Sequence, residues 1–216
     1  RNINFPKLAN DTLYPLFNRP LQSSYPPGST FKTLMALIGL QEGVITPNTT
    51  FGCQMGYHTR SLSVGCHSHP SPLDLPESIQ MSCNAYYCNV FRRVLDNPEY
   101  ASPKTGLDVW KDYLVEFGFG YPLGTDLSNE GRGFVPNSNY YDKIYNGSWG
   151  SLTVISLAIG QGELLTTPLQ MANMASAIAN RGYWHIPHVA KNIENDTIPS
   201  RFKEINQVGI DTTYFT

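Results

Sequence analysis

The sequence has 216 residues, with 15 basic and 17 acidic side chains and a formal net charge of −2 at pH 7. This balance gives no general attraction to nucleic acid or to an anionic membrane surface, so the composition argues against both. The length allows one sizeable domain with its own core, and the 18 glycines and 16 prolines fall short of a low-complexity composition. The longest apolar run, residues 34–40, is far shorter than the ~18 residues that a membrane span needs.

The first predicted element of regular structure is a buried helix. Prolines punctuate residues 1–28 and predict an irregular or extended segment there. A helix is predicted directly afterwards, over residues 29–42, and Gly43 ends it. Its residues are apolar on nearly every side, which indicates a central position in the core. Residues 44–72 are rich in Gly, Pro, Cys and His and predict a loop.

The rest of the chain predicts mostly further helices. Asp74 and Glu77 form a capping-box pattern, and Thr167 with Gln170 repeats this signal. Strand-like patterns are scarce, and the strongest covers residues 186–193. We therefore expect a helix-rich chain. The predicted helices cover residues 74–81, residues 84–95, residues 107–117 up to Gly118, and a segment after Thr167 that Gly182 ends.

Ser29 and Lys32 form an S-x-x-K pattern at the start of the buried helix. Residues three positions apart share one helical face, so the Lys32 amine can reach the Ser29 hydroxyl as a base reaches a nucleophile. The alternative is a capping serine followed by a solvated lysine. A lysine on so apolar a helix would be buried, however, and to act as a base its pKa must fall by ~3 units from about 10.4.

A second pattern, Ser82-Cys83-Asn84, lies at the junction between two predicted helices. The Ser82 hydroxyl can relay a proton, and the Asn84 amide can hold a substrate carbonyl or the lysine amine. Taken alone, Ser and Asn at this place are explained by helix capping. The combination of both patterns points to an acyl-transfer site.

These motifs resemble the transpeptidase domain of class B penicillin-binding proteins. The elongation type is more similar than the division type, because of the Tyr-Pro-Pro-Gly lead-in and the Thr-Pro-Leu-Gln stretch. The resemblance covers nearly the whole chain in order. It is carried by residues 25–32 (Tyr-Pro-Pro-Gly-Ser-Thr-Phe-Lys), 82–84 (Ser-Cys-Asn), 117–120 (Phe-Gly-Phe-Gly), 124–127 (Gly-Thr-Asp-Leu), 159–162 (Ile-Gly-Gln-Gly) and 167–172 (Thr-Pro-Leu-Gln-Met-Ala).

The resemblance implies an α/β (α+β) penicillin-binding and β-lactamase-like transpeptidase fold, mostly its helical part here, with the antiparallel sheet incomplete. It implies D,D-transpeptidation of peptidoglycan stem peptides, in which Ser29 forms an acyl-enzyme, Lys32 is the base, and Ser82 with Asn84 passes a proton to the leaving group. β-Lactams would acylate the same serine, and no cofactor is needed for catalysis. The implied location is the periplasmic face of the bacterial inner membrane, and the implied partner is a membrane glycan polymerase of the elongation machinery.

The family's third motif, Lys-Thr-Gly on an edge strand, is expected beyond Thr216. Residues 104–106 do read Lys-Thr-Gly, but they precede the Phe-Gly-Phe-Gly landmark that the motif follows in the family. We interpret them as a coincidence and predict that Lys104 is exposed and remote from Ser29. Residues 1–216 are thus expected to be a partial transpeptidase domain without membrane anchor, pedestal domain and C-terminal sheet strands, which alone reacts poorly with β-lactams.

A cluster of cysteines and histidines has three explanations. Cys53, Cys66, His69 and Cys83 can form a Cys₃His zinc site, with His67 as an alternative to His69, and some elongation-type relatives carry zinc in this region. In an oxidising periplasm, Cys53 and Cys66 can instead form a disulfide. The third explanation is that all of them are small buried side chains and loop histidines. Cys88 is expected to be a core residue.

Two other functions compete with transpeptidation. One is a β-lactam sensor or class D-like β-lactamase, which shares S-x-x-K but usually has an aliphatic residue where Asn84 stands. The other is a non-catalytic scaffold of the same fold that recruits a glycan polymerase. Labelled penicillin separates the three, because they predict stable acylation, rapid turnover and no labelling, respectively.

Overall fold

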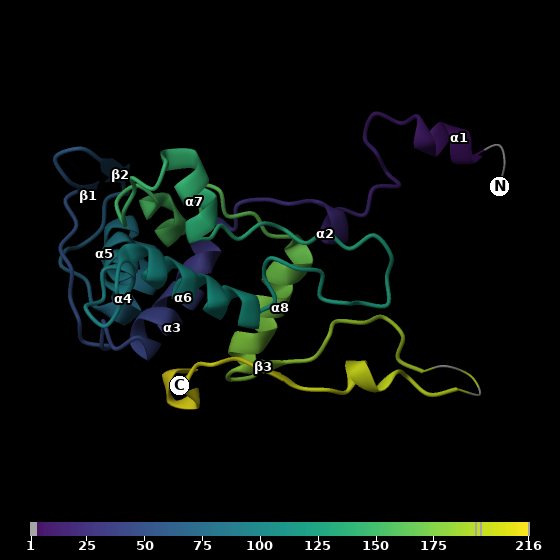
Figure 1. Ribbon diagram of the computed structural model, residues 1–216. Helices are drawn as coiled ribbons and strands as arrows, with labels where there is room; N and C mark the ends of the chain where they lie inside the picture. Colours follow the sequence, from purple (N-terminus) through teal and green to yellow (C-terminus); the bar gives the residue numbers. More distant parts are fainter. Residues whose placement is uncertain (1–3, 193, 195, 216) are drawn as a thin grey trace.

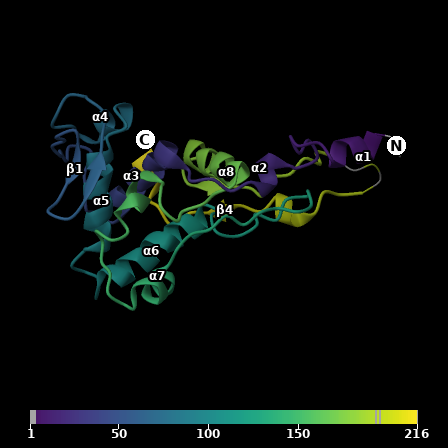
Figure 2. The same ribbon diagram turned by 90° about the horizontal axis from the view of Figure 1, so that it is seen from above.

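A group of helices forms one end of the molecule, and extended segments run away from it toward the other end (Figures 1 and 2). The computed structural model describes residues 4–192, 194 and 196–215. Among these residues, no helix combines the length and the hydropathy needed to cross a bilayer. The fold is a helix-rich mixture of helices and small antiparallel sheets, as the sequence predicted.

The helices follow the sequence prediction in most places. A short 3-10 turn, η1 (Gly28–Phe31), leads into the central helix α3 (Lys32–Gln41). Capping boxes begin two helices, at Asp74 and at Thr167, as predicted. The remaining helical elements are α1 (Asn4–Ala9), α2 (Arg19–Gln22), α4 (Leu75–Gln80), α5 (Asn84–Leu95), α6 (Pro103–Glu116), α7 (Ser138–Tyr145), α8 (Pro168–Ala179), η2 (Ile155–Ile159), η3 (Ser200–Phe202) and η4 (Thr212–Phe215).

Two antiparallel strand pairs are present among the described residues. Strand β1 (Gly56–His58) pairs with β2 (Ser63–Gly65), and Gly56 lies opposite Gly65. Strand β3 (Tyr183–Trp184) pairs with β4 (Asn206–Gln207). The first pair is a hairpin inside the segment that the sequence predicted to be a loop.

The structure also differs from the predicted secondary structure at α1 and α2, at the start of α6 and at α7. Residues 4–28 contain the two short helices α1 and α2 where the sequence predicted irregular or extended structure, and residues 1–3 lie outside the described residues. Helix α6 begins four residues earlier than predicted, because the Ser102 side chain caps it and Pro103 occupies its first turn. Helix α7 was not predicted at all, although the Asn137 side chain accepts a hydrogen bond from the Tyr140 backbone N–H.

The predicted strand over residues 186–193 is also wrong for residues 186–192, and Ile193 lies outside the described residues. Strand β3 ends at Trp184, before this segment begins. Pro187 has no N–H to donate to a ladder. The backbone N–H groups of Val189 and Ala190 donate instead to the Asp126 carboxylate.

The core lies between α3, α5, α6 and η2. Leu34, Met35 and Ile38 of α3 are completely shielded from solvent. The ring of Trp110 in α6 meets Phe31 and Phe91 edge to face, with centroids 6.0 and 5.4 Å apart. Because η1 and α3 pack directly on this core, the start of the central helix is held by the best-packed part of the chain.

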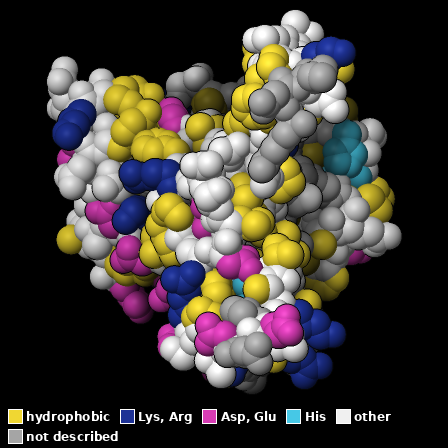
Figure 3. Space-filling model, turned by 90° about the vertical axis from the view of Figure 1, so that its right-hand side faces the viewer, with side chains coloured by type: hydrophobic (Ala, Val, Ile, Leu, Met, Phe, Trp, Pro, Cys, Tyr) yellow, Lys and Arg dark blue, Asp and Glu magenta, His cyan; other side chains and the backbone are white. Residues whose placement is uncertain are grey.

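The N-terminal segment, by contrast, leaves large apolar side chains in solvent. Helix α1 lies at the far end from the helical group in both ribbon views (Figures 1 and 2). The space-filling view of that end shows hydrophobic side chains at the surface between charged groups (Figure 3). The exposed large hydrophobic residues of this segment are Phe5, Leu8, Leu13, Tyr14, Leu16 and Phe17.

Gly106, the last residue of the Lys-Thr-Gly stretch at residues 104–106, lies at a close contact between two helices. It lies in α6, where the helix approaches the C-terminal end of α5 closely. A Cβ at this position would come within 2.5 Å of the Leu95 carbonyl oxygen and 2.7 Å of its Cα. Both are backbone atoms, so no side-chain movement can relieve the contact. The glycine therefore has a packing role between two helices.

We expect the substitution Gly106→Ala to lower the free energy of unfolding by about 1–3 kcal/mol, because the added methyl group forces α5 and α6 apart. Alanine's better helix propensity, worth up to ~1 kcal/mol, does not compensate for this. Denaturant unfolding measures the difference. Asp112→Ala, at an exposed position of the same helix, is the control and should change stability by less than about 0.5 kcal/mol. Equal stability of both variants would contradict the packing role.

Candidate active site

The turn that carries Ser29 is held by a hydrogen bond to the backbone of a segment that is distant in the sequence. The Gly28 N–H donates to the Gly160 carbonyl oxygen over 2.8 Å. Gly160 directly follows η2 and has a φ of +67°, in the left-handed region that favours glycine. A Cβ at Gly160 would collide with the Gly28 carbonyl oxygen and would lie 2.9 Å from the Phe31 Cβ. The chain can thus seat the serine turn on this loop only because residue 160 has no side chain.

Ser29 itself is exposed to solvent on η1, one turn before Lys32. Its carbonyl oxygen accepts the Lys32 backbone N–H, which fixes the spacing of the two residues. Within the described part of the chain, the Ser29 hydroxyl has no hydrogen-bond partner. The hydroxyl is therefore free to meet a molecule that approaches from solvent.

The Lys32 side chain is only 2% exposed and ends in a set of three oxygen acceptors. Its Nζ lies 2.6 Å from the Ser82 carbonyl oxygen, 3.0 Å from the Ser82 Oγ and 2.6 Å from the Asn84 Oδ1. An ammonium group would donate to all three acceptors. A neutral amine would donate to the two closer oxygens, and the Ser82 hydroxyl would then be able to donate to its lone pair. The arrangement therefore accommodates both protonation states.

Burial lowers the pKa of Lys32 below its usual value of 10.5, because the charged form loses its hydration. The thiol groups of Cys66, Cys83 and Cys88 act in the opposite direction, since negative charge on sulfur would stabilise the ammonium. The net shift is downward. A lowered pKa increases the fraction of neutral amine, which is the form that can take a proton from a hydroxyl group.

The Ser82 backbone is held in an unusual conformation. Its φ is +48°, a region that residues with a side chain rarely adopt and that costs of order 1–3 kcal/mol. This conformation turns both the carbonyl oxygen and the hydroxyl of Ser82 toward Lys32. The strain is thus located at the residue that supplies two of the three acceptors.

Asn84 begins α5 and is fixed by contacts on both sides of its amide. Its Oδ1 accepts from Lys32, and its Nδ2 donates to the Gly65 carbonyl oxygen over 2.8 Å. Because the Gly65 carbonyl oxygen can only accept, the neighbouring amide atom must be the Nδ2 donor, and the orientation of the amide is determined. The backbone N–H of Asn84 also donates to the Cys66 Sγ over 3.3 Å.

The four predicted metal ligands converge. One donor atom from each of Cys53, Cys66, His69 and Cys83 lies within 4.8 Å of all the others. The Cys66 Sγ and His69 Nε2 are 3.5 Å apart, and tetrahedral zinc with ordinary bond lengths would place sulfur and nitrogen ligands about 3.5 Å apart. His67 stacks edge to face on His69 but is not part of the group. All four cysteines of the chain are free thiols, and Cys88 is fully buried, as expected for a core residue.

The donor chemistry of this cluster fits a soft divalent metal. The His69 Nδ1 contacts the Pro70 carbonyl oxygen at 2.6 Å, which leaves the Nε2 lone pair directed at the sulfur atoms. Burial alone would raise the pKa of the Cys66 thiol, but the Asn84 N–H and the His69 ring outweigh it, so that the pKa lies below its ordinary value. Burial raises the pKa of Cys83 to about 12. Three thiols this close can all ionise only beside a cation.

Lys104 does not belong to this site. It lies in the first turn of α6, and its Nζ forms a salt bridge of 2.6 Å with Asp142. Its side chain is 35% exposed, so the prediction that Lys104 is exposed is wrong: the residue is half-buried, in contact with Asp142 and near the Trp149 ring. The interpretation that residues 104–106 are no edge-strand motif is confirmed, since they are helical.

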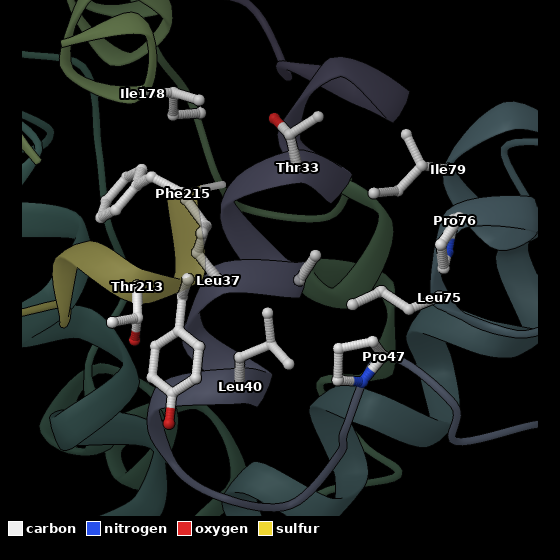
Figure 4. Close-up of a pocket in the computed structure, with 12 residues that line it drawn as sticks. Thr33, Leu37, Leu40, Pro47, Leu75, Pro76, Ile79, Ile178, Thr213 and Phe215 are labelled. Carbon is white, nitrogen blue, oxygen red and sulfur yellow. The ribbon is translucent and has the colours of Figure 1, made fainter. Parts of the chain in front are cut away.

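A separate apolar cavity of about 510 Å³ lies along α3, between α4, α8 and η4 (Figure 4). Thr33, Leu37 and Leu40 of α3 face it, together with side chains of the other three elements. None of Ser29, Lys32, Ser82 and Asn84 lines it.

Sequence reasoning did not find two groups of this site. The Gly65 carbonyl oxygen orients Asn84. Every residue has a backbone carbonyl, so the residue type at position 65 could not predict this contact. Gly160 seats the serine turn, and its signal was the Ile-Gly-Gln-Gly stretch of residues 159–162, which was used only as part of the resemblance.

The chain is similar to known proteins in both sequence and fold. The family described as "Penicillin binding protein transpeptidase domain" matches residues 3–213. Peptidoglycan D,D-transpeptidase MrdA of Haemophilus influenzae is 30% identical over 213 residues, which cover 94% of this chain and 31% of that protein. The chain thus spans about a third of the length of the curated relatives that it matches.

Two solved structures are similar over nearly the whole chain. The crystal structure of Pseudomonas aeruginosa PBP2 in complex with WCK 5153 has a TM-score of 0.84 and 26% sequence identity. The match covers 100% of this chain and 45% of the PBP2 chain. A structure described as the coordination of polymerization and crosslinking by a peptidoglycan synthase complex has a TM-score of 0.80 and 27% identity. The match covers 99% of this chain and 35% of the chain in that structure.

The lowered pKa of Lys32 can be measured directly. We expect the Lys32 Cε signal in ¹³C-lysine NMR spectra to titrate with a midpoint below 10.5, because burial disfavours the ammonium. A Lys32→Gln variant that lacks this signal provides the assignment. Since the folded chain then releases this proton before the unfolded chain does, Lys32 makes stability rise with pH between the two pKa values. A midpoint at or above 10.5 would show that the three acceptors stabilise the charge more than burial opposes it.

Proposed function

This chain belongs to the penicillin-binding protein transpeptidase domain family, and we propose that it carries the acylation site of a peptidoglycan D,D-transpeptidase. The observation that carries the proposal is the contact of the buried Lys32 amine with both Ser82 and Asn84, one turn below an exposed serine. The proposal takes Ser29 as the nucleophile, Lys32 as the base and Ser82 as the proton relay.

The first step of the proposed reaction is attack of the Ser29 hydroxyl on the carbonyl carbon of a terminal D-Ala-D-Ala peptide. Lys32, as a neutral amine, takes the hydroxyl proton while the new ester bond forms. The bond to the terminal D-Ala nitrogen then breaks. The proton passes from Lys32 through the Ser82 hydroxyl, 3.0 Å away, to the departing amine.

Asn84 has two tasks in this scheme. Its Oδ1 holds the Lys32 amine, and its Nδ2 donates one of two hydrogens to Gly65, so that the second hydrogen is available to a substrate carbonyl. In the second step, an amine from a neighbouring stem peptide attacks the acyl ester and restores the Ser29 hydroxyl. A β-lactam would acylate the same oxygen, and its opened ring would remain attached.

The alternatives are a β-lactam sensor or class D-like β-lactamase, and a non-catalytic scaffold. The polar contact of Asn84 with Lys32 favours the transpeptidase over the first, because those enzymes usually have an aliphatic residue at this place. The lowered pKa of Lys32 favours it over the second, since a scaffold has no use for a buried base.

We expect Ser29→Ala in the full-length protein to reduce covalent labelling by a fluorescent penicillin by at least about 10³-fold, because the nucleophilic oxygen is lost. Gel fluorescence after denaturation measures the labelling. Ser24→Ala is the matched control, since Ser24 is an exposed serine of the same segment, and this variant should be labelled like the wild type. Rapid loss of label from the wild type would favour the hydrolase, and absence of label would favour the scaffold.

We further propose that Cys53, Cys66, His69 and Cys83 hold a structural zinc ion. Such an ion would supply a cross-link between the β1–β2 hairpin region and the Ser82–Asn84 loop, and it would take no part in acyl transfer. Cys83 lies between the two residues of that loop, so the proposed ligand set restrains the loop directly.

Purified protein should contain about one zinc ion per chain by elemental analysis, and Cys53→Ala should lose it and melt at a lower temperature. Cys88→Ala is the control, because Cys88 is buried outside the ligand cluster; this variant should keep the metal. Absence of zinc together with a Cys53–Cys66 cross-link in mass spectra would replace the metal by a disulfide.

The remaining parts of the proposal concern location and partners. Because its substrate would be peptidoglycan, the protein is proposed to act at the periplasmic face of the bacterial inner membrane. A membrane glycan polymerase is the proposed partner, in line with the synthase complex that the chain resembles in structure. The third motif, the membrane anchor and the pedestal domain are proposed to lie outside these 216 residues.

A further inference from the structure

Two sulfur atoms cap the first turn of α5, the helix that Asn84 begins. The Asn84 N–H donates to the Cys66 Sγ over 3.3 Å, and the Tyr86 N–H donates to the Cys83 Sγ over 3.4 Å. The first N–H groups of a helix have no partner within the helix, so these contacts satisfy two of them. The sulfur atoms therefore fix where α5 starts.

The same region also fixes the Asn84 side chain. Gly65 and Cys66 are consecutive, and they hold Asn84 by its side-chain Nδ2 and by its backbone N–H. The Cys66 backbone N–H in turn donates to the Met55 carbonyl oxygen over 2.8 Å, next to the start of β1. The end of the β1–β2 hairpin thus holds Asn84 at two points, its side-chain amide and its backbone N–H.

We propose that Cys66 is a positioning residue for acylation, which acts through its hydrogen bond to the Asn84 backbone N–H and independently of metal binding. The inference rests on the proposed function of Ser29 and Lys32. Among the described residues, the Asn84 Oδ1 is one of three acceptors for the Lys32 amine, at 2.6 Å. A shift of the Asn84 backbone moves this oxygen, and with it the amine that must reach the Ser29 hydroxyl.

A Cys53 variant serves as the control that separates the effect of the Asn84 contact from the effect of metal loss. Cys53 belongs to the same group of four ligands, so its loss should disturb metal binding as much as the loss of Cys66. Its backbone N–H donates to the Ser71 Oγ over 2.8 Å, however, and none of its hydrogen bonds involves Asn84. The difference between Cys53 and Cys66 variants therefore isolates the contact with Asn84.

The experiment is a double-mutant cycle in the full-length protein, with pre-steady-state acylation by a fluorescent β-lactam as the readout. Cys66→Ala and Cys53→Ala are each made in the wild type and in an Asn84→Ala background. Zinc content and thermal melting are recorded for every variant, and rates are compared for the folded fraction. The limiting acylation rate and the half-saturating concentration are determined separately.

We expect Cys66→Ala to lower the limiting acylation rate at least about tenfold more than Cys53→Ala does, at equal zinc content. The reason is that displacement of Asn84 would move the Lys32 amine, and a misplaced base slows the reaction. In the Asn84→Ala background, the two cysteine variants should differ by less than about twofold. Cys66→Ser should recover most of the lost rate, because its hydroxyl oxygen can still accept the Asn84 N–H.

Equal rates of Cys66→Ala and Cys53→Ala would overturn the proposal, since the effect would then come from the metal or from the fold. A difference that persists unchanged in the Asn84→Ala background would also overturn it. The chemical shift of the Asn84 side-chain amide in ¹⁵N spectra tests the proposal without an activity measurement. This chemical shift should change in Cys66→Ala and remain unchanged in Cys53→Ala. If the wild type is not acylated at Ser29, the proposed function fails, and the amide signal still decides whether Cys66 positions Asn84.

Discussion

The structure depends most on the burial of one amine. Lys32 is the first residue of a helix whose other side chains form the core, so its amine cannot remain in bulk water. Such a group needs polar partners at close range, because an unpaired buried cation costs several kcal/mol. Ser82 and Asn84 supply these partners, and Asn84 also places the positive end of the α5 dipole beside the amine. Burial opposes the ammonium and lowers the pKa of Lys32, which increases the fraction of the neutral amine that can act as a base.

The nucleophile is positioned by backbone contacts, whereas the base is positioned by side chains. Ser29 sits on a 3-10 turn that a hydrogen bond from Gly28 ties to Gly160, with no room for a side chain between them. Lys32 reaches its acceptors through a long side chain that is packed among core residues. A turn held by its backbone leaves the Ser29 hydroxyl exposed and able to rotate, while the lysine beneath it is fixed. This division suits a site in which the nucleophile must form a bond and the base must not move.

Local signals in the sequence predicted the elements that local interactions stabilise. The capping boxes at Asp74 and Thr167 were correct because the residues that form them are three positions apart. The strand predicted over residues 186–193 was wrong because its N–H groups donate to Asp126, about sixty residues away in the chain. At the site, the residue types of Lys32, Ser82 and Asn84 predicted their contact. The Gly65 carbonyl and the thiol caps of α5 could not be predicted, since they depend on how a hairpin packs against a helix.

The segment of residues 82–84 contacts both the Lys32 amine and the thiol groups that cap α5. Ser82 is strained at a φ of +48°, and the strain persists only if its neighbours hold it. On one side the Lys32 amine binds Ser82 and Asn84, and on the other side Cys83 and Cys66 cap the helix that follows. Because both sets of contacts restrain the same backbone, we expect that loosening either one would let Ser82 relax and would withdraw its acceptors from Lys32. We therefore infer that Cys66 and Cys83 are mechanically coupled to the proposed acylation site through this backbone.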